Sequence, residues 1–476
     1  ERVFSAMATD RGEQREQLER IKKLFKEPSK SLKGIGALKS LIQLDLRFQG
    51  LTEVPKEVCA CVGLNKLDMG CNKLSALPEE MKNLTSLKIL FLTSNEFKIV
   101  PPVLSKMKGL SMLSLMRNKL KKLDCTDLPQ DMQWMIMTDN QISEVTSIGR
   151  LKKLQKCMFS HNNLHKFPED VKECTSLQML RLANNKFENV PTSVFKAPRI
   201  SWIALSGNPC TRKLVEIAVS GKSTQVDYKT LSFGETLGEG SGGKVRVATW
   251  TTTEKKVAVK EYRGSRFSDG TARDEWMLNT ALPPHPKILS ALGSFSEPHL
   301  GLVLELMENA TSVGGPPSLV TCTRDTPPRS GKLLSDVFAL KVAKSICEAA
   351  CHLHKYQIAH GDIYLHNTLT DAKGNIKLSD FGAGFVYPKN LQSMIEGTEV
   401  RSFGWLLDDL AKFTESKSQS SLITKGLQRL ADSCTKDGEP SKAPNFGILL
   451  QEFEQLQKSV SKDTQQVPAV QSGKAA

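Results

Sequence analysis

The sequence lacks the features of a membrane-spanning or secreted chain. No unbroken apolar run in its 476 residues approaches the roughly 18 residues that a membrane helix needs, and its mean hydropathy is −0.28. The first residues, ERVFSAMATDRGEQREQ, are charged and contain no apolar stretch ahead of a small-residue cleavage site. We therefore expect no membrane span and a cytoplasmic location.

Paired cysteines are also missing. The 11 Cys residues are an odd number, spread along the chain without a zinc-type CxxC pair or a dense disulfide framework. This pattern is typical of a reduced cytosolic or nuclear compartment.

Acidic residues are outnumbered, with 51 Asp and Glu against 65 Lys and Arg, which gives a net charge of +14. The basic residues are interspersed with acids, so a solvated surface explains the excess. Nucleic-acid binding would need a basic stripe or a recognition module, and the sequence shows neither. We expect no nucleic-acid partner.

A repeated pattern fills the first half of the chain. The motif LxxLxLxxNxLxxLP recurs from residue 41 with a spacing of 22 to 23 residues. Its first apolar position is occupied by Leu41, Leu64, Leu87, Leu110, Met132, Leu154, Leu177 and Ile200. Its asparagine position is occupied by Gln49, Asn72, Asn95, Asn118, Asn140, Asn162, Asn185 and Asn208. Eight registers in this order are not expected by chance.

Each LxxLxL segment predicts a short strand, and each asparagine can bond the exposed backbone of the turn between neighbouring repeats. One repeat cannot bury its apolar face alone, so the repeats must stack. With its short period and LP endings, this stretch resembles the leucine-rich-repeat family over residues 41–212. The resemblance implies an α/β solenoid. We expect a linker over residues 213–227.

The N-terminal segment, residues 1–40, is expected to cap the first repeat. Residues 13–27 carry apolar side chains at helical spacing, as an amphipathic cap would. A helix that binds calmodulin or a membrane surface is the alternative.

The variable strand positions predict a concave surface for a protein partner. Aromatic residues make up 6% of the chain and only 5 are Trp, yet two Trp lie in this column. Met and Trp clustered over consecutive repeats are typical of protein-binding patches. Packing against another part of this chain is the alternative. The predicted patch consists of Phe91, Met112, Trp134, Met158, Met179 and Trp202.

A glycine-rich segment opens the second half. LGEGSGGKV, residues 237–245, contains Gly238, Gly240, Gly243 and Val245. Without Cβ atoms, glycines let backbone N–H groups approach phosphates, and the valine can cover a purine ring. Alone, such a triplet is a weak signal.

Two charged residues follow at positions suited to phosphate binding. VAVK, residues 257–260, is a β-rich run ending in a lysine that could bridge phosphate oxygens, and Glu275 lies on a segment with helical spacing. A Lys–Glu pair positions the ammonium group and keeps it charged. Asp274 is the alternative partner. GLVLELM, residues 301–307, predicts a buried strand that runs into a hinge.

Three polar side chains stand at fixed separations in IAHGDIYLHNTL and IKLSDFGAG. Asp362 and Asn367 are five residues apart, and Asp380 stands thirteen further on. One carboxylate can orient or deprotonate a hydroxyl, while an amide and a second carboxylate can hold Mg²⁺ on ATP phosphates. The order of these signals makes residues 228–458 similar to the protein kinase family.

The resemblance implies an α+β bilobal domain that transfers phosphate from ATP with Mg²⁺ to a protein hydroxyl of the Ser/Thr type. It implies that Asp362 is the catalytic base, with Lys260 and Glu275 as the catalytic ion pair. It implies Asn367 and Asp380 as metal ligands. The implied ATP contacts are Leu237, Gly238, Gly240, Gly243, Val245, Ala258, Lys260, Leu304, Glu305, Met307 and Leu369.

The chain departs from the family pattern around its catalytic loop. The HRD arginine is Gly361, and the lysine two residues beyond the aspartate is Tyr364. Without that cation, Mg²⁺ and Lys260 must meet the charge of the transition state, and we expect a lower rate. Glu399 stands where an aspartate normally anchors the next helix.

The segment after DFG, AGFVYPKNLQSMIEGT, is short and has no APE motif, so most of the platform for a peptide is missing. A nucleotide-binding scaffold with little or no transferase activity therefore remains open, as does a small-molecule acceptor. Residues 309–331, rich in Gly, Pro, Ser and Thr, predict a mobile insertion, and residues 459–476 a disordered tail.

Overall fold

The computed structural model describes residues 41–219, 224–240, 242–264, 266–267, 269–415 and 422–466. The predicted N-terminal cap and residues 467–476 of the predicted tail lie outside the described residues. Within the described ranges, no helix combines the length and apolarity needed to cross a bilayer.

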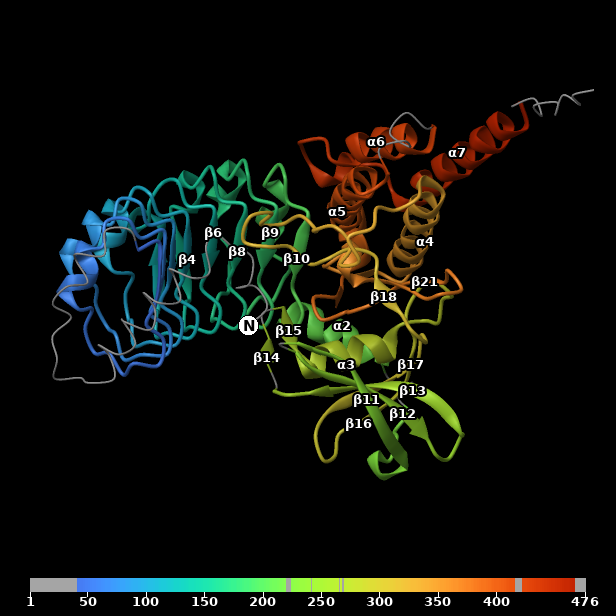
Figure 1. Cartoon of the computed structure of the whole chain (residues 1–476), viewed down its shortest axis with the longest axis horizontal. Coiled ribbons are helices and arrows are strands. Elements are labelled where there is room, and N and C mark those ends of the chain that lie inside the picture. The colour runs from blue at the N-terminus through green and yellow to red at the C-terminus, as the bar shows by residue number, and fades with distance from the viewer. Residues whose placement is uncertain are drawn as a thin grey trace, which may run out of the picture.

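The first half forms an eight-stranded parallel sheet with one short strand in each repeat (Figure 1). The strands are β1 (Gln43–Asp45), β2 (Lys66–Asp68), β3 (Ile89–Phe91), β4 (Met112–Ser114), β6 (Trp134–Ile136), β8 (Lys156–Met158), β9 (Met179–Arg181) and β10 (Trp202–Ala204). The middle residue of each strand points into the core, and Leu67 and Leu113 there are fully buried. The first and third residues line the concave face.

Short 3₁₀ helices form the opposite side of the repeats. They span Lys56–Ala60, Glu79–Asn83, Pro102–Lys106, Cys125–Asp127, Ile148–Arg150, Glu169–Glu173 and Thr192–Lys196, with a second strand pair β5 (Lys122–Asp124) and β7 (Glu144–Thr146). The proline of each LP ending caps one of these helices, as Pro78 and Pro168 do. A proline suits this place because its φ is fixed and a helix start needs no N–H from it.

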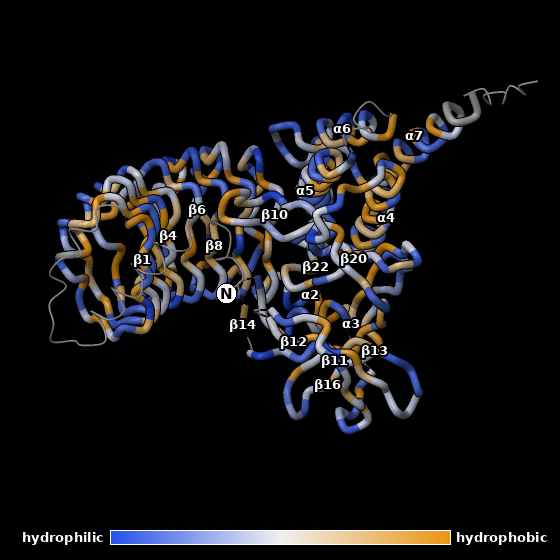
Figure 2. The backbone as a smooth tube through the Cα atoms, in the orientation of Figure 1, coloured by the Kyte–Doolittle hydropathy of each residue, from blue (hydrophilic) through white to orange (hydrophobic). Residues whose placement is uncertain are grey.

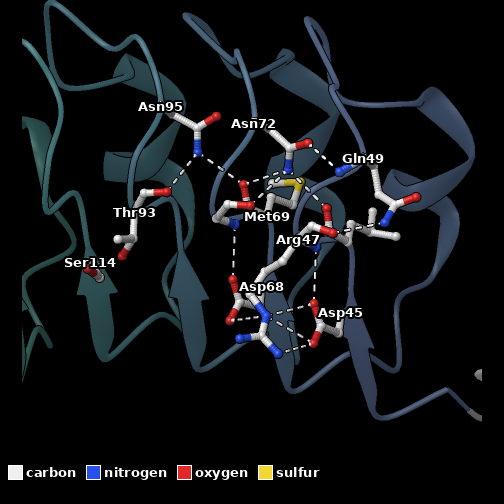
Figure 3. A network of polar contacts seen from close by, with 11 residues as sticks. Asp45, Arg47, Gln49, Asp68, Met69, Asn72, Thr93, Asn95 and Ser114 are labelled. Atoms are coloured by element: carbon white, nitrogen blue, oxygen red, sulfur yellow. Dashed lines mark hydrogen bonds and ion pairs between the residues drawn. The ribbon is translucent and has the colours of Figure 1, made fainter. Parts of the chain in front are cut away.

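The asparagine ladder predicted from the repeats is confirmed by the hydrogen bonds. Asn72 donates from Nδ2 to the carbonyls of Leu46 and Met69, both at 2.9 Å, and accepts the N–H of Gln49 at 3.1 Å (Figure 3). Asn95 repeats this geometry one repeat further on. Buried backbone groups in the turns are thus satisfied by side chains, as stacked repeats require.

The second half begins with a five-stranded antiparallel sheet in the order β11-β12-β13-β17-β16. The strands are β11 (Leu231–Gly240), β12 (Gly243–Trp250), β13 (Lys255–Tyr262), β16 (Ala291–Phe295) and β17 (Gly301–Glu305), and helix α3 (Ala272–Ala281) packs beside them. The small pair β14 (Arg266–Phe267) and β15 (Gly270–Thr271) leads into α3.

A helical body follows, built from α4 (Asp336–Lys355), α5 (Gln392–Lys412), α6 (Leu422–Cys434) and α7 (Phe446–Gln466). Two small sheets lie at its edge: β18 (Thr311–Ser312), β20 (Thr368–Thr370) and β21 (Ile376–Leu378) in one, β19 (Ile358–Ala359) and β22 (Phe385–Val386) in the other. Figure 2 shows hydrophobic segments gathered along the repeat strands and on α4.

Two expected boundaries differ from the structure. Helix α2 (Pro209–Val219) occupies much of the predicted linker and packs on α3, since Leu214, Val215 and Ala218 give it an apolar face. Helix α7 continues to Gln466, into the predicted tail, because Leu456 and Val460 extend the face that it packs on the helical body.

The two halves share one core. The hydrophobic cluster of the repeats also contains Ala359, Phe385 and Tyr387 of the second half. Polar contacts add to it: Arg401 of α5 donates to the carbonyl of Ile200 at 2.8 Å. The end of the repeat sheet at β10 therefore lies against the helical body (Figure 1).

The segment 309–331 is anchored, contrary to its predicted mobility. Gly315 and Thr326 exchange backbone hydrogen bonds at 2.8 and 2.9 Å. The hydroxyl of Thr323 donates to Gln178 on the repeats, and Arg324 pairs with Asp408 and Asp409 of α5. Composition suggested a solvated loop, but these long-range contacts fix it.

The predicted partner surface is covered by the chain itself. Leu319 and Cys322 of the insertion pack against a cluster formed by Ile89, Phe91, Met112 and Trp134. Met179 and Trp202 form another cluster with Tyr364 of the second half. Met158 is buried as well. The six predicted residues are therefore buried in this structure, and binding of a second protein there stays a prediction.

Candidate active site

Lys260 lies on β13, where its side chain meets two carboxylates. Its Nζ forms an ion pair with Glu275 of α3 and lies 3.6 Å from Oδ1 of Asp380. Burial lowers the pKa of Lys260, but Asp380 and Glu275 raise it above its ordinary value, so the ammonium group stays charged. Asp274 pairs instead with Arg212 of α2 at 3.2 Å. The geometry thus selects Glu275 as the lysine's partner.

Asp362 and Asn367 lie on the loop between β19 and β20. The amide nitrogen of Asn367 donates to the carbonyl of Asp362 at 2.9 Å and to its Oδ2 at 3.0 Å. Because the nitrogen donates both bonds, the amide oxygen is the atom left to bind a cation. Asp380 follows β21 with a left-handed φ of 60°. The nearby Lys260 charge lowers the pKa of Asp380, so its carboxylate is ionised.

The donor set fits a nucleotide-borne magnesium ion. In the part of the chain that the structure describes, no three His, Cys, Asp or Glu side chains converge as metal ligands. Mg²⁺ at phosphate-transfer sites is held by one or two side chains together with phosphate oxygens. Asn367 and Asp380 supply such a pair.

The three glycines of the loop have different reasons to be glycine. A Cβ at Gly238 or Gly240 would meet nothing within 4 Å, so the chain's own packing does not demand glycine there. That open space is what an approaching phosphate needs. A Cβ at Gly243 would lie 2.1 Å from the carbonyl oxygen of Glu261, so this glycine is required by the hairpin itself.

Three of the predicted adenine contacts come together. Ala258 and Leu304 face each other across β13 and β17, and Val245 packs on the same cluster. Leu237 is 51% exposed and stands apart from this cluster.

The hinge after β17 is fixed by its polar neighbours. The side chain of Glu305 accepts the N–H of Ser290 at 2.7 Å and pairs with Lys377 at 2.8 Å. Met307 is buried beyond it, and Leu369 lies on β20 opposite Lys377. The Glu305 side chain thus has a structural role, and its backbone N–H is also engaged, by the carbonyl of Ser290 at 3.0 Å.

Glu399 anchors the catalytic loop. Its carboxylate accepts the backbone N–H groups of His360, at 3.1 Å, and of Gly361, and lies 2.9 Å from Nε2 of His354. Helix α5 starts at Gln392, ahead of Glu399, so the segment after DFG is shorter than its sequence suggested.

Both substituted positions of the catalytic loop face the repeats. Gly361 has a φ of 74°, and a Cβ there would lie 2.6 Å from the carbonyl oxygen of Ala383 and 2.7 Å from that of Ile203 on β10. The ring of Tyr364 stacks on Trp202, with centroids 4.7 Å apart and planes 2° apart. An arginine at position 361 would not fit beside the repeat strand.

Sequence reasoning missed Arg181, the last residue of β9. Its guanidinium donates to the carbonyl of Gly361 at 2.9 Å, forms a short ion pair with Asp362 and lies 2.9 Å from Oδ1 of Asp269. The only signal in the sequence is a charged residue in a column that is otherwise mostly apolar in the later repeats.

Comparisons with known proteins agree with this geometry. Residues 231–401 match the family model described as protein kinase domain. A probable serine/threonine-protein kinase of Dictyostelium discoideum is 27% identical over 250 residues, which is 47% of this chain and 14% of that protein.

Two further relatives match over shorter stretches. CBL-interacting serine/threonine-protein kinase 1 of Arabidopsis thaliana is 32% identical over 31% of this chain and 32% of its own length. NUAK family SNF1-like kinase 2 of Rattus norvegicus is 28% identical over 33% of this chain and 24% of its own length. The matches span a third or less of these three relatives. Residues 231–401 of this chain are therefore similar to a protein kinase domain.

Proposed function

We propose that the chain is an ATP- and Mg²⁺-dependent protein kinase of the Ser/Thr type, with its catalytic unit at residues 228–458. The pairing of Lys260 with Asp380 supports this most directly, together with the bonds that join Asp362 to Asn367 and Asn367 to Ser379, the neighbour of Asp380. Lys260, Asp362 and Asp380 each have the charge state that phosphotransfer requires.

In this proposal each polar group has one task. Lys260, held by Glu275, binds the nucleotide phosphates, and Asn367 and Asp380 hold Mg²⁺. Bound Mg²⁺ supplies charge neutralisation on the phosphate oxygens. Asp362 orients the acceptor hydroxyl and accepts its proton. The hydroxyl oxygen bonds to the γ-phosphorus as the bond from that phosphorus to the β,γ-bridging oxygen breaks, which leaves ADP.

The repeats are proposed to be leucine-rich repeats over residues 41–212. The regular parallel strands, the asparagine ladder and the proline-capped 3₁₀ helices support this assignment. Their concave face binds the chain's own insertion, so recruitment of another protein would use a different surface or a different arrangement. A reducing, cytoplasmic location is part of the proposal, since all 11 cysteines are free thiols.

A nucleotide-binding scaffold is the second candidate function. The observation that favours it is the stack of Trp202 on Tyr364, which places a repeat strand beside the catalytic loop where a peptide acceptor would need room.

Phosphate transfer decides between the two functions. The full chain is incubated with γ-labelled ATP and Mg²⁺, and label is followed into the chain itself, into casein and into inorganic phosphate. We expect transfer that Asp362→Asn removes and that EDTA stops. One outcome would refute the kinase function and support the scaffold. In it, ATP binds, as seen by a thermal shift that depends on Lys260, but phosphate transfer is no greater than that of the Asp362→Asn variant.

A further inference from the structure

The departures from the kinase pattern share one location. Gly361 and Tyr364 both contact β10, through the carbonyl of Ile203 and the ring of Trp202. The short segment after DFG leaves room for this strand, with Ala383 packed on Ala204. The catalytic loop and the end of the repeat sheet are therefore shaped to each other.

At this junction a cation reaches the catalytic loop from the repeats. Arg181 has only 3% of its side chain exposed, and its guanidinium meets Asp362, Asp269 and the carbonyl of Gly361. A planar guanidinium can satisfy several acceptors at once in a fixed geometry. Position 364, which holds a lysine in typical members of the family, carries a phenol here, and among the described residues Arg181 pairs with the Asp362 carboxylate.

The strands beside the catalytic loop are tied to the second half. Trp202 on β10 donates from Nε1 to the carbonyl of Ile363 at 3.2 Å, in addition to its stack on Tyr364. Arg401 and Trp405 of α5 bond to Ile200 and Ser201 just before β10. These contacts hold β10, and β9 paired to it, against the loop.

The contact orients Asp362 without sealing it. Oδ1 faces Arg181 and Oδ2 faces Asn367, yet 19% of the Asp362 side chain remains exposed. Burial raises the pKa of Asp362, but Arg181, His366 and His360 together more than offset this, so the pKa lies below its ordinary value. An ionised carboxylate with one open edge is what a base for a hydroxyl needs.

We propose that Arg181 is a positioning residue of the phosphotransfer site, a cation that the repeats supply in place of the one missing from the catalytic loop. The inference rests on the proposed kinase function and deepens it. The repeats then complete the site, and the kinase half alone lacks a part of it.

The test compares Arg181→Gln, Arg181→Lys and a matched control, Arg199→Gln, in the full chain. Arg199 also joins the halves, through Asp437 at 2.9 Å, but lies away from the catalytic loop. The kcat of label transfer to the chain itself, to casein and to water is measured, with ATP affinity measured separately.

We expect Arg181→Gln to lower kcat about 10- to 100-fold, as loss of an orienting partner does, with ATP affinity unchanged. Arg181→Lys recovers most of kcat, and Arg199→Gln matches the wild type. Wild-type kcat in Arg181→Gln, or a raised kcat, would overturn the inference.

A second variant covers the case in which Arg181→Gln does not fold. Asp269→Asn removes the carboxylate that lies 2.9 Å from Nε of Arg181, so kcat should fall while ATP affinity stays unchanged. An unchanged kcat would count against the inference. A wild-type chain that transfers no more label than Asp362→Asn would refute the proposed function and with it this inference, whereas wild-type kcat in the Arg181 and Asp269 variants would refute the inference alone.

Discussion

Replacing Gly361 with alanine tests whether the repeat strand lies as close to the catalytic loop as the structure places it. The residue has a left-handed φ of 74°, and a Cβ would come within 2.7 Å of backbone oxygens on both Ala383 and Ile203. Gly374 is a matched control, because its φ is 73° but a Cβ there meets only the terminal nitrogen of Lys341, at 3.1 Å.

The difference between the two variants isolates the steric contact. A left-handed φ costs an L-residue about 1–2 kcal/mol, and both variants bear that cost. Overpacking against fixed backbone costs about 1–3 kcal/mol more, and only Gly361→Ala bears it, since the lysine end can move. We expect Gly361→Ala to be less stable than Gly374→Ala by about 1–3 kcal/mol.

Urea unfolding followed by tryptophan fluorescence measures this difference, because Trp202 and Trp405 lie at the junction of the halves. The transition that reports on the junction should shift by about 1 M urea between the two variants. Equal midpoints would refute the close approach of Ile203 to the loop. A larger loss in Gly374→Ala would refute the reasoning about strain as well.

Two further predictions concern the repeats and the insertion. Asn118→Ala should destabilise the repeats by about 1–3 kcal/mol for each buried group left unpaired, because the Asn118 side chain bonds the carbonyls of Leu92 and Leu115 and the N–H of Phe97. Calorimetry measures this loss, and an unchanged unfolding transition would contradict the asparagine ladder. Burial raises the pKa of Asp409 to about 6, against the opposing effect of Arg324. The protonated Asp409 side chain therefore contributes its full stabilisation below about pH 4, and this stabilisation is lost as the pH rises through about 6. Asp409→Asn should remove that decline in melting temperature between pH 4 and 7, and a decline as steep as that of the wild type would contradict it.

Much of the site could be predicted because its signals are local. Asp362, Asn367 and Asp380 are recognisable by their spacing, and Lys260 is predicted from the β-rich run that ends in it and lies 3.6 Å from Asp380. Arg181 could not be predicted, because it reaches the loop through tertiary docking over a long sequence separation. The reason for glycine at position 361 lies equally in a distant strand.

The fold shows the same division. Periodicity predicts the repeat strands and their asparagine bonds, since each repeat contacts its neighbours. Composition misjudged the segment 309–331, because Thr323, Arg324 and Asp325 are fixed by partners that lie far away in sequence. The same segment packs on the apolar column from which a protein partner was predicted, so that these side chains are buried within the chain.

The anchored insertion also limits which changes in repeat number this chain can tolerate. Its Leu319 rests on the cluster at β3, β4 and β6, while Thr323 reaches Gln178 just before β9. Adding or deleting a repeat between β3 and β9 would change the distance between the Leu319 contact and the Thr323 contact by a whole strand spacing, so the insertion could not keep both. Repeats could be gained or lost at the β1 end without this penalty, so length variation among natural versions of the chain should concentrate there.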